Sequence, residues 1–412
     1  MDDKSFYQAV LGLAAPWSVT SVQLLPESQE VQVVVGLGPD ARLRCPDCDT
    51  VCPGYDHTEE RRWRHLDTMQ YRTILISRIP RVRCPEHGVR QVNVPWSEPR
   101  SRFTALFEAW AIRLLRESSV SGVAELLGVS WDEAAHIQSR AVARGLERRS
   151  REPVRVLGID ETSFQKRHEY VTVVNDLEGD RVLWVGDHRR EATLRTFWES
   201  WSVEERRGLR AVVMDMWDPY IAATRECVPH GLSKIVFDRY HVAAHLTAAV
   251  SDVRKAEQRE LRREGDAVGA AALKGKRFVL VRGTAKRTAQ DEAEIAALRR
   301  AGFKVGRAWS LKEAARSIWE CPTAKAAMQQ FQKWYGWAMR SRLTPMKRAA
   351  RTMKKYLYGI LKYTNHPFTN ASTEGMNSKI QLIKHRARGY RNRDNFRTAI
   401  LFHCGRLDMN PR

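Results

Sequence analysis

The chain of 412 residues has few cysteines and no long apolar run. Four of its seven cysteines lie near the N-terminus and three are scattered singly, which is not the pattern of a disulfide framework. No stretch of about eighteen apolar residues occurs, and the acidic start MDDKSFYQAV has neither a basic n-region nor an apolar h-region. We therefore expect a soluble, cytoplasmic protein without a membrane span.

Acidic residues are also in deficit. The chain has 69 Lys and Arg against 48 Asp and Glu, a net charge of +21 and a pI of about 10.0. An excess of this size most simply indicates a polyanionic partner, and nucleic acid is the first candidate. The alternatives are solubility or the Arg-rich habit of a high-GC genome. The length and the 43% hydrophobic content allow two to three domains with cores.

The chain has no internal repeat and no low-complexity segment, so apolar periodicity indicates its organisation. Residues 18–43 alternate apolar and polar side chains, as in VQVVV and ARLRC, and predict strands; residues 71–83 predict a hairpin. From Phe103 about forty-five residues have helical spacing, until Pro153. Residues 241–365 are almost wholly helical in pattern, and a final helix is expected to begin near Thr369 and continue into a basic tail.

Between these helical regions the pattern is mixed. The runs VRVLGID, EYVTVVND and RVLWVG predict three strands, followed by a helix near 190–203, a strand in AVVMDMWDPY, a short helix and a fifth strand in KIVFD. Three strands, helix, strand, helix, strand is the element order of the RNase H-like fold. We therefore predict an α/β class with an RNase H-like core and a large helical insertion.

Two cysteine-containing turns predict a zinc site. Cys45-Pro-Asp-Cys48 and Cys84-Pro-Glu-His87 each leave two residues between ligands, so both side chains of a pair can turn toward one tetrahedral ion. Cys52 is a rival ligand, and the alternative is that these are ordinary buried cysteines. The role would be structural, because four protein ligands leave no position for water.

Residues 120–146 have a helix-turn-helix pattern. A short helix with Ala124 ends at Gly128, Ser130 caps a second helix together with Glu133, and Ile137 is the apolar anchor. A plain helical linker is the alternative, since such patterns have many false positives. The groove-facing candidates are Ser130, Trp131, Glu133, His136 and Arg140.

The chemistry is expected at three acids. In an RNase H-like sheet the first and fourth strands are parallel neighbours, which brings Asp160 and Asp215 together, and Glu374 is the candidate from the last helix. Glu374, Asn377 and Gln381 are spaced to share one polar face. Converging carboxylates suit two Mg²⁺ or Mn²⁺ ions that act on a phosphodiester.

Each acid also has an ordinary interpretation. Strand-end acids often cap turns or pair with arginine, and Glu374 could simply lie in the first turn of a helix. The element order that joins all three favours the catalytic role. Asp218 is expected to cap the helix after the fourth strand.

Four blocks of sequence resemble those of a known family: GIDETSFQKRHEYVTVVND, VVMDMWDPY, VFDRYHVAAHL and NASTEGMNSKIQLIKHRARGYRNRDNFRTAIL. They are similar to blocks of the bacterial insertion-sequence transposases of the ISL-three family, and the order of zinc knuckles, helix-turn-helix and catalytic part agrees. The resemblance implies a DDE transposase with Asp160, Asp215 and Glu374 as its metal-binding triad. It also implies assembly as a dimer or higher on paired DNA ends.

The resemblance assigns auxiliary residues as well. Asp238 and His241 in FDRYH resemble an acid, two residues, histidine signature that organises the DNA strand or the edge of the active site; with His245 they could instead form a second metal site. Candidates for DNA contact beside the triad are Asn377, Lys379, Lys384, Arg386, Arg388, Arg391, Arg393 and Arg397, with a solvated helix face as the alternative. The tryptophans of the insertion, at positions 309, 319, 334 and 337, should mostly be core.

These observations predict a nucleoid-associated transposase that binds terminal inverted repeats and joins them to target DNA. Both the repeats and the target are expected to be double-stranded DNA. Water attack first releases a 3′-hydroxyl, which then attacks the target. The rivals are an RNase H-like nuclease or resolvase without joining, and a domesticated DNA-binding regulator. We expect four parts: a β-rich zinc domain (1–100), the helix-turn-helix (101–150), the catalytic domain (151–240 and 366–402) and the insertion (241–365).

Overall fold

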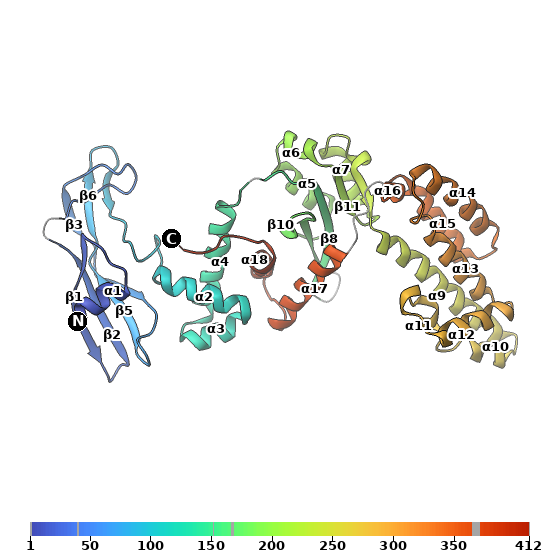
Figure 1. Cartoon of the computed structure of the whole chain (residues 1–412), viewed down its shortest axis with the longest axis horizontal. Coiled ribbons are helices and arrows are strands. Elements are labelled where there is room, and N and C mark those ends of the chain that lie inside the picture. Colours follow the sequence, from blue (N-terminus) through green and yellow to red (C-terminus); the bar gives the residue numbers. More distant parts are fainter. Residues whose placement is uncertain (1, 39–40, 151, 166–168, 365–370, 412) are drawn as a thin grey trace. The chain divides into compact units, whose positions relative to one another are not determined.

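The computed structural model describes residues 2–38, 41–150, 152–165, 169–364 and 371–411, with the side chains of residues 285 and 371–374 outside this description. It divides into two compact units, which we call unit 1 (residues 1–150 and 407–412) and unit 2 (residues 151–406). Figure 1 gives the labels of the helices and strands. None of the helices in the described ranges has the length and apolarity needed to cross a lipid bilayer.

Unit 1 begins with two small sheets. One has the order β1-β2-β5-β4 and the other β3-β6-β7. The bounds are α1 (Asp3–Val10), β1 (Trp17–Leu25), β2 (Glu30–Leu37), β3 (Gly54–His57), β4 (Arg61–Arg64), β5 (Arg72–Ser77), β6 (Pro80–Cys84) and β7 (Gly88–Gln91). Trp63 and Trp17 both meet Trp96 edge to face in the core of the first sheet.

Two predictions for this region are wrong in detail. Residues 71–83 do contain two strands, but β5 pairs with β2 and β4 whereas β6 pairs with β3 and β7, so they do not form a hairpin. The link Arg78-Ile79 has none of the residues that favour a two-residue hairpin turn, and Ile79 is fully buried as the chain passes between sheets. ARLRC is not a strand either; it has only the isolated bridge of Arg44 to Val51.

The helical end of unit 1 agrees with its prediction. Helices α2 (Ala105–Glu117), α3 (Val120–Leu127) and α4 (Trp131–Glu147) follow one another. Gly128 ends α3 at a φ of 60°, and Ser130 and Glu133 form the expected capping box at the start of α4. Ile137 is fully buried.

Unit 2 contains a five-stranded sheet in the order β10-β9-β8-β11-β12. Its strands are β8 (Val156–Gln165), β9 (Glu169–Asp176), β10 (Arg181–Asp187), β11 (Ala211–Met214) and β12 (Ile235–Phe237). Strands β8 and β9 and strands β9 and β10 are antiparallel, whereas β11 lies parallel to both β8 and β12. The helices between the strands are α5 (Glu191–Glu199), α6 (Val203–Gly208), α7 (Asp218–Cys227) and α8 (Gly231–Lys234).

A group of helices follows β12 and shares its core with the sheet (Figure 1). It comprises α9 (Arg239–Arg263), α10 (Ala267–Ala272), α11 (Arg277–Val281), the 3₁₀ turn η1 (Thr284–Lys286), α12 (Ala289–Arg300), α13 (Lys304–Arg316), α14 (Ala324–Arg340), α15 (Thr344–Lys355) and α16 (Leu357–Lys362). Gly359 lies so close to Phe237 that a Cβ would approach its ring to 2.5 Å. Trp309, Trp319 and Trp334 are buried as predicted, whereas Trp337 is exposed.

The predicted final helix is followed by another one. Helix α17 (Ala371–Arg386) ends where Arg388 and Gly389 adopt positive φ angles, and Asn392 then caps α18 (Arg393–Cys404). The predicted basic tail is therefore partly helical, because the apolar spacing of Phe396, Ile400 and their neighbours supplies a buried face.

Candidate active site and metal centres

The two aspartates lie together because their strands are in parallel register. Met214, the last residue of β11, pairs with Ile159 of β8, so Asp160 in β8 lies beside Asp215, which directly follows β11. A carboxylate oxygen of each and a ring nitrogen of His241 all lie within 4.8 Å of one another. The predicted proximity of Asp160 and Asp215 is confirmed, and His241 at the start of α9 is the third group of this cluster.

Asp160 is buried beside a second carboxylate. Burial, followed by the nearby charge of Asp215, raises the pKa of Asp160 to about 6. Its Oδ2 accepts a hydrogen bond of 2.6 Å from Asn377 Nδ2, and its Oδ1 accepts one of 2.7 Å from the backbone N–H of Glu161. The site thus combines converging carboxylates with one cationic neighbour, His241, and offers the hard oxygen ligands that a divalent cation needs.

His241 lies between Asp215 and Asp238, its partner in the predicted signature. Its Nδ1 lies 3.0 Å from Asp215 Oδ2, and its Nε2 lies 3.6 Å from Asp238 Oδ2. Burial lowers the pKa of His241, but the hydrogen bond to Asp215 and the charges of the three aspartates outweigh burial and raise the pKa to about 9. His245 is exposed, and the only clusters of ligands in the described part of the chain do not include it.

Helix α17 lays its polar face along β8 as the spacing predicts. Gln381 Nε2 donates to Thr162 Oγ1 over 2.8 Å, and Lys384 Nζ donates to the carbonyl of Ser163 over 2.8 Å. Together with the contact of Asn377, these bonds follow one strand from Asp160 outward. The backbone of Glu374 belongs to the same helix, but its side chain lies outside the described residues.

The other basic candidates fall into two groups. Lys379 lies 3.5 Å from Asp180, Arg393 lies 3.0 Å from Glu169, and Arg397 lies 3.0 Å from Asp187, so these three form ion pairs within unit 2. Arg386, Arg388 and Arg391 are exposed, as is Lys379.

Two residues near Asp215 differ from expectation or were missed. Asp218 does not cap α7: it is the first helical residue, Trp217 holds the cap position, and Asp218 pairs with Lys355 and the hydroxyl of Tyr356. Arg189 was not predicted, although its guanidinium lies 4.4 Å from the ring of Tyr170 and 4.8 Å from that of Trp217. The tryptophan after Asp215 was the available signal for such a stacking cation.

The four predicted zinc ligands come together in unit 1. Ligand atoms of Cys45, Cys48, Cys84 and His87 all lie within 4.8 Å of one another, and His87 sits in the turn between β6 and β7. Cys48 and Cys84 sulfurs are 3.7 Å apart, and Cys84 Sγ is 3.6 Å from His87 Nδ1. Ligands about 2.3 Å from a tetrahedral zinc are about 3.8 Å from each other, so the set fits this ion. Cys52 lies outside the cluster, and its thiol bonds to the carbonyl of Thr50.

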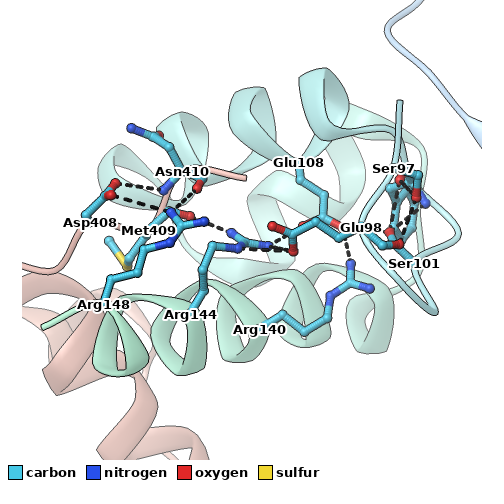
Figure 2. A network of polar contacts seen from close by, with 11 residues as sticks. Ser97, Glu98, Ser101, Glu108, Arg140, Arg144, Arg148, Asp408, Met409 and Asn410 are labelled. Atoms are coloured by element: carbon cyan, nitrogen blue, oxygen red, sulfur yellow. Dashed lines mark hydrogen bonds and ion pairs between the residues drawn. The ribbon is translucent and has the colours of Figure 1, made fainter. Parts of the chain in front are cut away.

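The helix-turn-helix exposes some of its candidates and pairs another within unit 1. Ser130, Trp131 and His136 are exposed on α4. The structure gives Arg140 another role, because its guanidinium pairs with the buried carboxylate of Glu108 (Figure 2).

A polar network that the sequence did not predict holds this region together (Figure 2). Arg144 lies 3.1 Å from Glu108 Oε2, pairs with Glu98 and donates to the carbonyl of Met409. Arg148 donates over 2.6 Å to the carbonyl of Asn410. Residues 407–411 therefore pack on α4 as part of unit 1.

Comparison with known protein families gives a match for three segments of the chain. Residues 157–400 match the DDE transposase domain of the ISL3 type, residues 92–142 match the helix-turn-helix domain of transposase family ISL3, and residues 41–87 match the zinc-finger of the IS204/IS1001/IS1096/IS1165 transposases.

Two relatives match along most of their length. The transposase for insertion sequence element IS1001 of Bordetella parapertussis is 28% identical over 376 residues, 90% of this chain and 91% of the relative. The transposase for IS1557 of Mycobacterium tuberculosis (strain CDC 1551 / Oshkosh) is 28% identical over 416 residues, 95% of this chain and 93% of the relative. The catalytic match covers more than half of the residues, and the sequence resemblance is confirmed: the chain is a DDE transposase, an enzyme that acts on DNA, and belongs to transposase family ISL3, the ISL-three family.

Proposed function

We propose that this transposase binds the terminal inverted repeats of its element through residues 1–150 and cleaves and joins DNA at Asp160, Asp215 and Glu374. The observation that carries the proposal is the parallel register of β8 and β11, which brings Asp160 and Asp215 to one edge beside the polar face of α17. The strand order β10-β9-β8-β11-β12 supports an RNase H-like core, and the helices after β12 support a helical insertion.

Glu374 completes the triad in this proposal. Position 374 precedes Asn377 by three residues in α17, and helical spacing puts both positions on the face that runs along β8. The three carboxylates would hold two Mg²⁺ or Mn²⁺ ions. Such ions, when bound, supply activation of the attacking oxygen and charge stabilisation of the leaving oxygen.

The chain's own residues then orient the carboxylates. Asn377 fixes the rotamer of Asp160 through its amide, and His241 holds Asp215 while Asp238 holds the other side of the imidazole. Such supporting contacts keep a catalytic group in productive geometry. The exposed Arg386, Arg388 and Arg391 would neutralise DNA phosphates beside this edge.

DNA recognition is proposed for the exposed start of α4. Ser130, Trp131 and His136 lie in the first turns of the second helix of a helix-turn-helix, which is where base-reading residues are found. The four parts that the sequence predicts, including the boundary between catalytic domain and insertion, and assembly as a dimer or higher on paired ends, are further parts of the proposal.

A joining assay tests the function. The chain is incubated with labelled inverted-repeat DNA, a target plasmid and Mg²⁺, alongside Asp215→Asn and the matched control Asp218→Asn. We expect a joined product that Asp215→Asn loses and Asp218→Asn keeps, since Asp218 pairs with Lys355 on the surface. Cleavage without joining would support the alternative of a nuclease. Binding without cleavage or joining would contradict both the transposase and the nuclease.

Zinc content tests the N-terminal cluster. We expect one zinc per chain, lost in Cys48→Ser and His87→Ala and retained in Cys52→Ser, whose thiol lies outside the cluster in the same segment. Zinc retention in His87→Ala would show that the ligand set is wrong.

A further inference from the structure

Arg189 lies in the short loop between β10 and α5 and contacts a neighbour of each aspartate. Its Nη1 donates to Glu161 Oε1 over 2.7 Å, and its carbonyl accepts a hydrogen bond of 3.1 Å from Trp217 Nε1. Glu161 directly follows Asp160 in the sequence. Trp217 stands two residues after Asp215. A single residue of this loop therefore meets the segments that carry both carboxylates.

Two backbone N–H groups complete the connection to the aspartates. The N–H of Glu161 donates to Asp160 Oδ1 over 2.7 Å. The N–H of Trp217 donates to the carbonyl of Asp215, also over 2.7 Å. The contacts thus form a continuous path from the carboxylate of Asp160 to the backbone of Asp215, with Arg189 at its centre.

Aromatic rings and the sheet hold Arg189 in place. Its guanidinium lies 4.4 Å from the ring centroid of Tyr170 and 4.8 Å from that of Trp217. The preceding residue, His188, has a φ of 64° and is bonded to β9 on both sides of its peptide units. Its N–H donates to the carbonyl of Tyr170 over 2.9 Å, and its carbonyl accepts from Thr172 Oγ1 over 2.6 Å. The geometry of the loop is therefore set by the sheet that carries the site.

We propose that Arg189 is a positioning residue that fixes the spacing of Asp160 and Asp215 and thereby strengthens the binding of divalent cations between them. It acts through Glu161 and Trp217 and is not itself a ligand. The proposal rests on the metal-dependent cleavage proposed above, because that reaction needs both carboxylates in one fixed arrangement. Residues that orient metal ligands in this way typically contribute about 10- to 100-fold to metal affinity.

A contact between Arg189 and a DNA phosphate explains less of the geometry. Glu161 already pairs with the guanidinium, and two rings lie against it. A phosphate would have to displace this carboxylate before it could bind. The carbonyl of Arg189, which accepts the bond from Trp217, would have no part in such a contact.

The test measures Mn²⁺ binding to the full-length, zinc-loaded chain by electron paramagnetic resonance in the absence of DNA. Only the binding that Asp215→Asn abolishes is counted. Arg189→Gln removes the guanidinium, and Arg189→Lys keeps the charge without the planar fork that meets the carboxylate and the rings. We expect both variants to raise the Kd for Mn²⁺ roughly tenfold.

The matched control is Arg190→Gln in the same loop. Arg190 is exposed at the N-cap of α5, and its side chain makes no capping bond, so the Kd should stay unchanged. Trp217→Phe tests the other half of the path, since it removes the indole N–H and keeps an aromatic ring; it should raise the Kd roughly threefold. Circular dichroism shows whether each variant is folded, and if Arg189→Gln is not, Trp217→Phe decides.

Two results would overturn the proposal, whatever the cleavage result. One is wild-type affinity for Mn²⁺ in Arg189→Gln, and the other is wild-type affinity in Arg189→Lys, because charge alone would then suffice. If the wild type itself showed no Mn²⁺ binding that depends on Asp215, the proposed metal site and hence the proposed function would be overturned instead. The two failures are therefore distinguishable.

Discussion

Glu108 in unit 1 and Asp160 in unit 2 are both carboxylates withdrawn from water, but their surroundings are opposite. Glu108 is 1% exposed and receives Ser101 Oγ over 2.6 Å as well as the guanidinium groups of Arg140 and Arg144. Asp160 has one amide and one backbone N–H and faces the carboxylate of Asp215. Two arginines compensate the charge of Glu108, which supports the fold. Asp160 shares one cationic neighbour, His241, with a second carboxylate, and this arrangement suits an added cation.

The largest effect should come from neutralising Asp160. We expect Asp160→Asn to lower cleavage by on the order of 10³-fold or more, because the proposed metal site loses a charge. In EDTA its unfolding midpoint should stay the same or rise, since the substitution removes repulsion with Asp215. Cleavage rates and denaturant titrations check both, with Asp218→Asn as the control. A strong loss of stability in Asp160→Asn would show that Asp160, like Glu108, supports the fold.

Neutralising the other carboxylate should have the opposite signature. Glu108→Gln leaves the buried Arg144 poorly compensated and should cost unit 1 about 3–5 kcal/mol of unfolding free energy. The measurement is a denaturant titration. The transition of unit 1 is the one that should move to higher denaturant when zinc or inverted-repeat DNA is added, because both are proposed to bind this unit. Glu125→Gln, on the exposed surface of α3, should change stability by less than about 0.5 kcal/mol. Equal effects of the two substitutions would show that the network is not structural.

A buried histidine makes unit 1 sensitive to acid. Burial, with a contribution from Arg64, lowers the pKa of His65 to about 4, so the unfolded chain binds a proton at a higher pH than the folded one. Stability is therefore lost as the pH falls from about 6.5 to 4, by on the order of 3 kcal/mol. Denaturant titrations across this range should show a steeper loss for the wild type than for His65→Gln. Parallel curves would contradict the assignment.

The smallest effect concerns the C-terminal segment. Arg148→Ala removes the bond to the carbonyl of Asn410 and the contact with Asp408, and should cost unit 1 about 1 kcal/mol. The control is Glu147→Ala, an exposed residue next to it on the same helix. If both variants unfold alike, residues 407–412 add nothing to the stability of unit 1.

Features that depend on a few neighbouring residues could be predicted. The capping box of Ser130 and Glu133, the end of α3 at Gly128 and the pairing of ligands in the two cysteine-containing turns depend on local hydrogen bonds and spacing. The hairpin at 71–83 and the cap at Asp218 were also local predictions, and they failed because the available partners lie elsewhere: β2 and β4 for β5, and Lys355 for Asp218.

The sequence by itself indicated most of the element order, the positions of Asp160 and Asp215 on neighbouring strands and the four residues of the predicted zinc cluster, because these follow from periodicity and from ligand chemistry over short spans. Only the tertiary structure decided that His241 meets Asp215, that Arg140 turns to Glu108, and that Arg189 lies against the ring of Trp217. In each case a charge or ring finds its partner across a long stretch of chain. Periodicity indicates which face of a helix is polar, but not which partner packing brings to that face.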